Sequence, residues 1–292
     1  MSWKPIEPGT YDSTYVGPMP DMLYRYRGIN DENYKSRLDQ EVDRREIFLC
    51  PFGRLNDPME GIYQISVHGE QQEIIEKFTR LRREAFPTES VEELDIFVKH
   101  VLRYLRESGG LAPPEITENF KRLCNELVRV ACFTEDPLNR HMWRKYGRWR
   151  RNTEVEWEGG ICIGYCGGEG MRIVGVAPVM YRPGVPTVDV LQLDRTPSAL
   201  RDLLFVKQTR WQREREWRIA SNFGIDAIGH PDLDKISRIA FDEDGLPDVI
   251  IGRRTPRCVV DYLESISSRR ALPLNLLRVH EVNGELVLRP FD

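Results

Sequence analysis

Apolar residues change their spacing along the chain, and the change divides the sequence into segments of different kinds. Residues 1–22 are rich in proline and glycine and show no periodicity, which predicts an extended lead-in. Residues 22–29 and 46–52 favour short strands. After residue 130, short apolar runs alternate with turn signals, and Asn283-Gly284 is typical of a two-residue hairpin. The second half of the chain is therefore predicted to be a sheet.

Between these strand-rich parts the apolar spacing is helical. Three segments within residues 70–130 place apolar side chains three and four positions apart, and Ser90 with Glu93 forms a capping box at the start of the second. Shorter helices are expected at 138–147, 197–208 and 255–268. The strands are spaced too irregularly for a doubly wound parallel sheet. The sequence thus predicts one α+β domain over residues 23–292 with a helical insertion at about 70–130.

Composition narrows the class of protein. Hydrophobic residues make up 40% and charged residues 30% of the 292 positions, which are values of a globular chain. No apolar run approaches the roughly 18 residues of a membrane span, and the N-terminus has no basic and apolar signal, so we expect a cytoplasmic protein without a membrane partner. The six cysteines include no C-x-x-C pair, which favours free thiols over a zinc site.

Charge limits the choice of partners. The chain has 42 basic and 46 acidic residues and a net charge of -4, which argues against a surface built as a whole for nucleic acid. Local basic patches remain compatible with this balance.

Residues 210–221 hold the most informative polar pattern. As a strand, this segment would place Glu214, Glu216 and Arg218 on one face and the apolar side chains on the other. Two carboxylates at this spacing lie roughly 6 to 7 Å apart, close enough to share one small substrate and to split their pKa values. Such a pair suits a reaction with a positively charged sugar in its transition state. The alternative is a solvated strand face on which glutamates pair with arginines.

A second cluster lies at residues 132–151. Its part from Arg140 to Arg151 contains six basic residues and no acidic one, interleaved with Trp143, Tyr146 and Trp149. Basic charge among aromatic rings fits the phosphates and rings of a dinucleotide, or a nucleic acid strand. A solvated helix face explains the same pattern equally well.

Weaker signals come from a loop and a histidine. Asp57 and Glu60 are potential metal ligands, although turn chemistry explains the same residues more simply. His141 is the one histidine within a candidate site, and no pair of histidines has metal-ligand spacing. No metal is expected.

Several motifs together carry a resemblance to known proteins. They are LYRYRG (23–28), LNDPMEG (55–61), CFTE (132–135), HMWRKYG (141–147) with GICIGY (160–165), and EREWRI (214–219). In this order they resemble a widespread bacterial family of uncharacterised proteins, over residues 23 to about 252. The order is also similar to the plan of mono-ADP-ribosyltransferases, in which an early strand supplies Arg or His, a middle strand Ser or Thr, and a late strand the catalytic Glu. This resemblance implies an ADP-ribosyltransferase-like split sheet.

The resemblance also implies roles for individual residues. Arg25, together with Tyr24, would hold the phosphates or ribose of NAD, and Thr134 would take the middle-strand position. Glu216 would be the catalytic glutamate, and Glu214 would orient or deprotonate the acceptor.

The basic and aromatic cluster would complete such a site. Trp143 and Tyr146 would pack against nicotinamide or adenine, and Arg148, Arg150 and Arg151 would bind the acceptor, a nucleic acid or an acidic protein. The expected function is NAD-dependent ADP-ribosyl transfer or NAD hydrolysis, with NAD as co-substrate, in a bacterial defence system, such as phage defence, or a toxin system. The alternatives are a non-catalytic binding module of such a system, and a metal-dependent phosphodiesterase that uses Asp57, Glu60 and the glutamate pair.

Overall fold

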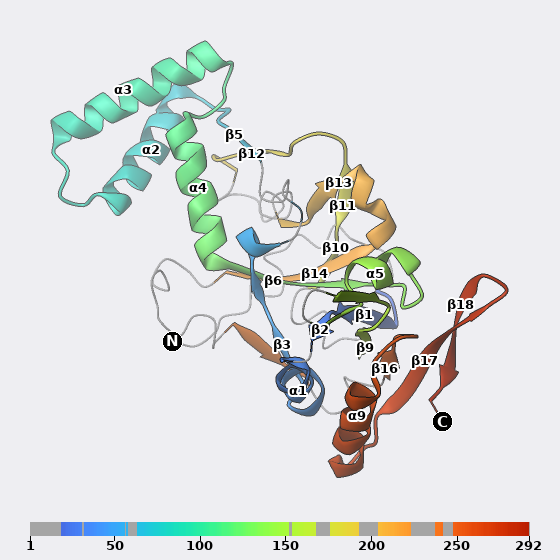
Figure 1. Ribbon diagram of the computed structural model, residues 1–292. Coiled ribbons are helices and arrows are strands. Elements are labelled where there is room, and N and C mark those ends of the chain that lie inside the picture. Colours follow the sequence, from blue (N-terminus) through green and yellow to red (C-terminus); the bar gives the residue numbers. More distant parts are fainter. Residues whose placement is uncertain are drawn as a thin grey trace.

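A central mixed sheet organises the protein (Figure 1). The computed structural model describes residues 19–30, 32–55, 57, 63–151, 154–167, 176–192, 204–222, 237–241 and 248–291. Within these residues the chain is α+β, with helices and several sheets. The predicted lead-in, except for its last residues, and Glu60 lie outside the described residues.

The central sheet has the strand order β10-β14-β6-β1-β9-β16-β17-β18, and β4 also pairs with β6. In this order the strands are Ala177–Pro178, Glu216–Asn222, Val128–Thr134, Met22–Arg27, Ile161–Cys166, Asp248–Ile251, Asn275–Val282 and Glu285–Pro290, with β4 at Cys50–Pro51. The pairs in it are antiparallel except for β16 with β17. The predicted hairpin is confirmed, because Asn283 and Gly284 both take the positive φ angles of its turn.

Smaller sheets flank the central one. They pair β2 (Ile29–Asn30) with β7 (Arg148–Arg151) and β8 (Glu154–Trp157), β11 (Met180–Arg182) with β13 (Val206–Gln208), β12 (Thr187–Asp189) with β5 (Gln64–Ser66), and β15 (Arg238–Ala240) with β3 (Glu46–Phe48). Residues 197–203 of the helix predicted at 197–208 lie outside the described residues, and the prediction is wrong at its end, where Val206–Gln208 form the strand β13. Its residues pair in parallel with β11, a contact between distant parts of the chain that local apolar spacing does not reveal.

Three helices separate β5 from β6. They are α2 (Gln71–Ala85), α3 (Val91–Ser108) and α4 (Pro114–Leu127). Figure 1 shows α2 and α3 packed together away from the central sheet, with α4 leading back to β6. The capping box of α3 is present, since the Ser90 side chain accepts a hydrogen bond from the Glu93 amide and the Glu93 carboxylate accepts one from the Ser90 amide. None of the described helices is both long and apolar enough to cross a membrane.

The largest apolar core lies between the central sheet and α9 (Arg257–Arg269). Val259, Val260, Leu263 and Ile266 are fully buried on α9 because they recur at helical spacing on one face. They pack in one cluster with residues of β1, β6, β9, β14 and β16. The strands that carry the candidate site are therefore fixed from behind by α9.

Replacement of Leu263 tests this support. Leu263→Ala should lower the free energy of unfolding by about 2 to 5 kcal/mol, because it opens a cavity behind the sheet. Urea denaturation measures the change. Leu272→Ala is the matched control, since Leu272 is 52% exposed and its truncation should cost less than about 0.5 kcal/mol. Equal losses in the two variants would show that α9 does not support the sheet.

Candidate functional site

A split in the central sheet creates a pocket. Tyr24 opposite Thr134 is the one registered pair between β1 and β6 in the described chain, whereas β1 pairs with β9 along its whole length. Farther along the same edge of β6, β4 takes over, with Cys50 opposite Val130. The edge of β6 between these two contacts faces a cavity of about 220 Å³.

The wall of this cavity comes from segments distant in sequence. Its lining residues are Tyr24, Arg25, Tyr26, Arg27, Cys50, Arg54, Leu55, Val130, Cys132, Phe133, Met142, Tyr146, Lys207, Glu214 and Glu216. Five motifs identified in the sequence thus contribute to one pocket: LYRYRG, LNDPMEG, CFTE, HMWRKYG and EREWRI.

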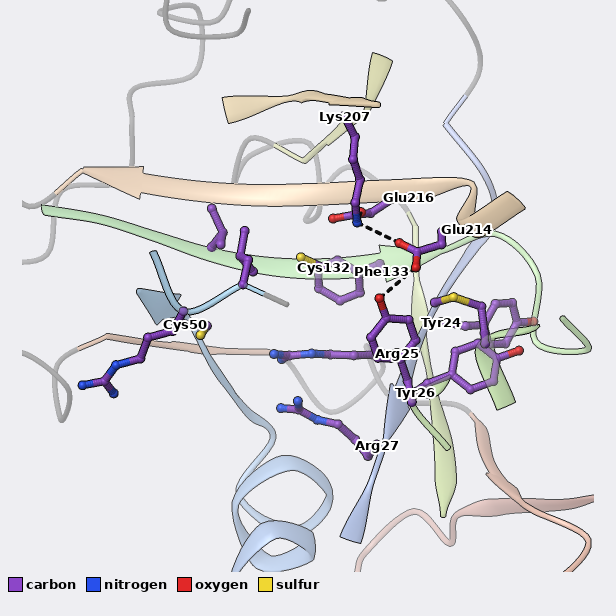
Figure 2. A pocket seen from close by; sticks show the side chains of 15 residues that line it. Tyr24, Arg25, Tyr26, Arg27, Cys50, Cys132, Phe133, Lys207, Glu214 and Glu216 are labelled. Atoms are coloured by element: carbon purple, nitrogen blue, oxygen red, sulfur yellow. Dashed lines mark hydrogen bonds and ion pairs between the residues drawn. The ribbon is translucent and has the colours of Figure 1, made fainter. Parts of the chain in front are cut away.

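Glu214 and Glu216 meet at Lys207, but not as neighbours on a strand face. Thr209–Glu214 forms a 3-10 helix, η3, and β14 begins only at Glu216. Arg215 between them has a φ of 45°, the left-handed conformation, which ends η3. The prediction of one strand over 210–221 is therefore wrong at its start. The Lys207 ammonium lies 2.8 Å from the Glu214 carboxylate and 2.7 Å from that of Glu216 (Figure 2).

The surroundings of Glu216 are buried and charged. Arg218, which is 0% exposed, donates from Nε to Glu216 Oε1 at 2.6 Å, and the Glu216 amide donates to the Tyr181 hydroxyl at 2.8 Å. The alternative of a solvated strand face is wrong about solvation, because both faces of β14 are covered at this end, but the glutamate–arginine pair that it predicted is present. Buried charges of this kind are retained only when they are paired.

Glu214 is held by several donors. The Tyr146 hydroxyl donates to Glu214 Oε1 at 2.8 Å, and the Lys145 ammonium lies 3.2 Å from the same atom. Thr134 is fully buried, and its hydroxyl donates to the backbone carbonyl of Glu214 at 2.7 Å. Thr134 thus positions the turn that carries Glu214, and no surface of it is available to a ligand.

The two carboxyl groups have pKa values shifted in opposite directions. Burial alone would raise the pKa of Glu214, but Lys207, Tyr146 and Lys145 together outweigh it and hold the pKa below its usual range. Complete burial raises the pKa of Glu216, and the opposing charge of Lys207 only partly offsets this. The pair therefore combines an ionised carboxylate with one that binds a proton more readily.

The other end of the pocket is cationic. Arg25 donates from one guanidinium nitrogen to the Phe48 carbonyl at 3.1 Å, and its buried Nη1 has no hydrogen-bond partner among the described residues. Figure 2 shows Arg27 extending beside Arg25, and Arg27 is paired with the buried Glu41. Four basic and two acidic side chains line the cavity, with Arg54 as the remaining cation. This balance favours an anionic ligand.

Asp57, from the LNDPMEG motif, also belongs to this region. Its buried carboxylate accepts a hydrogen bond from Arg210 at 3.1 Å. Its charge acts on Lys145 and Arg218, although burial has the larger effect and lowers the pKa of both. No group of three potential metal-ligating side chains occurs among the residues that the structure describes.

The aromatic residues that were predicted to contact the ligand do not all line the pocket. Tyr146 and Tyr24 line the pocket. Trp143 has no exposed surface, because its indole packs edge-on against Tyr26 and donates to the Pro137 carbonyl at 2.9 Å. The prediction that Trp143 packs against a ligand ring is thus wrong for this conformation.

The basic stretch from Arg140 to Arg151 is not one surface. Arg140 pairs with Glu281, and Lys145 turns inward to Glu214. The guanidinium of Arg148 lies 4.5 Å from the centre of the Trp157 ring. Arg150 is exposed, and the side chain of Arg151 is outside the described residues.

Lys207 is not among the predicted site residues, although it joins the two glutamates. Lys207 follows the apolar run Leu203 to Val206, where a buried lysine is unusual. A lysine directly after an apolar run is the one local feature of the sequence that could have marked Lys207 as a site residue. Its role depends on β13, whose pairing partner β11 lies more than 20 residues away.

No family model, curated protein or solved structure matches this chain. The geometry of the pocket therefore carries the functional argument.

The ion pairs of Lys207 predict how the free energy of unfolding depends on pH. Glu214 has a lowered pKa, so its contribution is present above the usual carboxyl pKa and is lost as pH falls through the lowered value. Lys207 has a raised pKa, so its contribution is lost only at alkaline pH. Lys207→Met should cost about 3 to 5 kcal/mol at about pH 7, because it leaves buried carboxylates unpaired.

At low pH the Glu214 and Glu216 carboxylates become protonated, which removes the cost of leaving them buried without a positive partner. The difference between Lys207→Met and wild type in urea denaturation should therefore shrink at about pH 3. Lys99→Met removes an exposed ion pair with Asp95 and should cost less than about 1 kcal/mol. A Lys207→Met penalty that is the same at both pH values would contradict the assignment of the ion pairs.

Proposed function

We propose that the protein breaks the nicotinamide–ribose bond of NAD and transfers ADP-ribose to an acceptor, in the manner of a mono-ADP-ribosyltransferase. One observation carries the proposal. A pair of glutamates with pKa values shifted in opposite directions lies in the same pocket as a buried arginine, Arg25, whose Nη1 has no hydrogen-bond partner in the described part of the chain. The carboxylates suit a sugar cation, and the guanidinium suits a phosphate.

The split of the central sheet supports the finer fold assignment that goes with this activity. Arg25 lies on β1, Thr134 at the end of β6, and Glu216 at the start of β14. The registered pairs Tyr24 with Thr134 and Thr134 with Glu216 place Tyr24, the neighbour of Arg25, in line with the other two positions. This arrangement agrees with an ADP-ribosyltransferase-like split sheet.

The size and charge of the pocket indicate how NAD would bind. A cavity of about 220 Å³ is smaller than the roughly 300 to 1,000 Å³ of sites for complete drug-sized ligands, so it would enclose one part of the dinucleotide. We assign this part to the nicotinamide ribose, beside the glutamates. Arg25 Nη1 would then donate to the diphosphate.

Glu216 can meet the ribose without losing its ion pairs. Oε1 accepts from Arg218 and Oε2 from Lys207, and a carboxylate has about four lone-pair sites in all. The Cys132 thiol bonds the same carboxylate, so about one site is left for a ribose hydroxyl. The carboxylate would act at short range on the developing oxocarbenium ion, because Lys207 and Arg218 offset its charge at longer distance.

The proposed reaction breaks one bond of NAD and forms one bond to the acceptor. The glycosidic bond breaks, and its electron pair leaves with the nicotinamide nitrogen. A nucleophilic atom of the acceptor forms a bond to the anomeric carbon and releases a proton, which Glu214 or Glu216 accepts. With water as the acceptor the same steps give NAD hydrolysis.

The alternatives receive less support. A metal-dependent phosphodiesterase would need Asp57 as a ligand, but this carboxylate is engaged by Arg210. A non-catalytic binding module would not require two carboxyl groups whose pKa values are shifted in opposite directions. We also propose a cytoplasmic location, which suits the six free cysteines. Nicotinamide release from NAD, measured with and without EDTA, separates the three functions.

Glu216→Gln tests the reaction directly. This variant should lower the rate of nicotinamide release at least a hundredfold, because the loss of a preorganised group at the reacting centre raises the barrier by about 2.7 kcal/mol or more. Glu214→Gln should reduce transfer to an acceptor more than NAD hydrolysis. Wild-type turnover by folded Glu216→Gln would exclude its catalytic role, and equal losses of the two activities in Glu214→Gln would exclude the division of labour.

Arg25→Lys tests the phosphate contact. Lysine keeps a positive charge but loses the forked donor, so NAD affinity in calorimetric titration should fall about tenfold. Arg106→Lys is the control, because Arg106 is exposed on α3 and far from the pocket in sequence and fold. Unchanged NAD affinity in Arg25→Lys would show that Arg25 has only a structural role on β1.

A further inference from the structure

Three exposed arginines gather where η3 meets α5 (Arg140–Lys145). Arg213 and Arg215 flank the pocket residue Glu214, and Arg144 precedes Lys145. The Asn139 side chain donates to the Arg213 carbonyl at 2.6 Å and thereby joins the two elements. We name Arg144, Arg213 and Arg215 the arginine rim.

The rim is unneutralised. None of its three guanidinium groups has a hydrogen bond or ion pair within the part of the chain that the structure describes. Glu281, which contacts α5 through Arg140, is shared by Arg140 and Arg253 and is therefore already neutralised. In a protein with a net charge of -4, this local excess of positive charge points to an anionic partner.

The rim is also close to the catalytic carboxylates. His141 is 45% exposed, and its Nε2 lies 3.9 Å from Glu214 Oε1. One side chain thus separates the protein surface from Glu214. A polymer held on the rim would have its reactive groups next to the pocket.

Aromatic rings beside the basic residues distinguish between anionic partners. Trp157 on β8 is 46% exposed, and Arg148 lies over its ring. Trp211 on η3 is half-buried beneath the ammonium of Lys145, at 3.3 Å from the ring centre. An acidic protein would use the charges alone, whereas bases of a single strand stack on exposed rings while its phosphates meet arginines.

We infer that the arginine rim binds the phosphodiester backbone of a single-stranded nucleic acid, with Trp157 as a stacking platform for a base. Binding itself is independent of the reaction at Glu216. That this nucleic acid is the acceptor of ADP-ribose rests on the proposed function.

The test is fluorescence anisotropy with labelled single-stranded DNA and RNA of about 12 nucleotides. The variant Arg144→Ser/Arg213→Ser/Arg215→Ser should bind at least tenfold more weakly at about 100 mM salt. The slope of log affinity against log salt should fall by about 2, which is roughly 0.7 for each of three phosphates. Trp157→Ala should weaken binding at least fivefold and leave this slope unchanged.

A matched control uses arginines of α2 and α3. The variant Arg83→Ser/Arg103→Ser/Arg106→Ser removes the same charge from exposed positions, and it should bind as wild type does. Absence of oligonucleotide binding by the wild-type protein, or equal losses in the two triple variants, would overturn the inference. Tighter binding of polyglutamate than of either oligonucleotide would also overturn it, in favour of an acidic protein.

Nicotinamide release without oligonucleotide separates this inference from the proposed function. The variant Arg144→Ser/Arg213→Ser, which leaves Arg215 and the bend between the glutamates unchanged, should release nicotinamide from NAD at the wild-type rate. A wild-type protein that binds oligonucleotides through the rim but releases no nicotinamide would leave the surface assignment intact and refute the reaction.

Discussion

The separation of β1 from β6 is the constraint on which the site depends. These strands meet at Tyr24 and Thr134 and are not paired beyond that point, so the edge of β6 is left open until β4 reaches it. An open strand edge inside a protein leaves polar backbone groups to be satisfied. Long charged side chains line the pocket at this gap, with Arg25 bonded to the Phe48 carbonyl and Lys207 joining the glutamates. The gap between β1 and β6 therefore creates both the pocket and the space that its charged side chains occupy.

The buried charges of the pocket are unusual for groups that only stabilise a fold. Lys207, Arg218 and Glu216 are each less than one-tenth exposed, and ion pairs in such places seldom stabilise a fold more than apolar residues would. Their presence beside the split of the sheet agrees with the proposed role of the pocket in recognition or chemistry. Lys207 and Arg218 each donate to one oxygen of the Glu216 carboxylate and so fix its orientation. The Glu216 side chain therefore needs little rearrangement when a ligand binds.

Local signals made part of this structure predictable. The capping box of Ser90 and Glu93 set the start of α3, and the spacing of Glu214 and Glu216 marked them as a pair. The bend between the two glutamates was not predictable, because Arg215 is not a residue that signals a positive φ. Trp143 belongs to the core for a reason that spacing does not give, namely its packing against Tyr26 of a distant strand. Lys207 enters the site through the pairing of β13 with β11, which is likewise non-local.

The left-handed backbone of Arg215 limits which residues this position can accept without cost. A non-glycine residue in this conformation costs roughly 1 kcal/mol or more, and glycine or asparagine would relieve it. The chain nevertheless carries an arginine there, exposed, between two buried glutamates. Backbone preference and side-chain charge therefore oppose each other at a single position. In a set of natural variants, selection for folding alone would move this position toward glycine, while selection for a positive surface would retain arginine or lysine, so the residue found there records which of the two pressures is stronger.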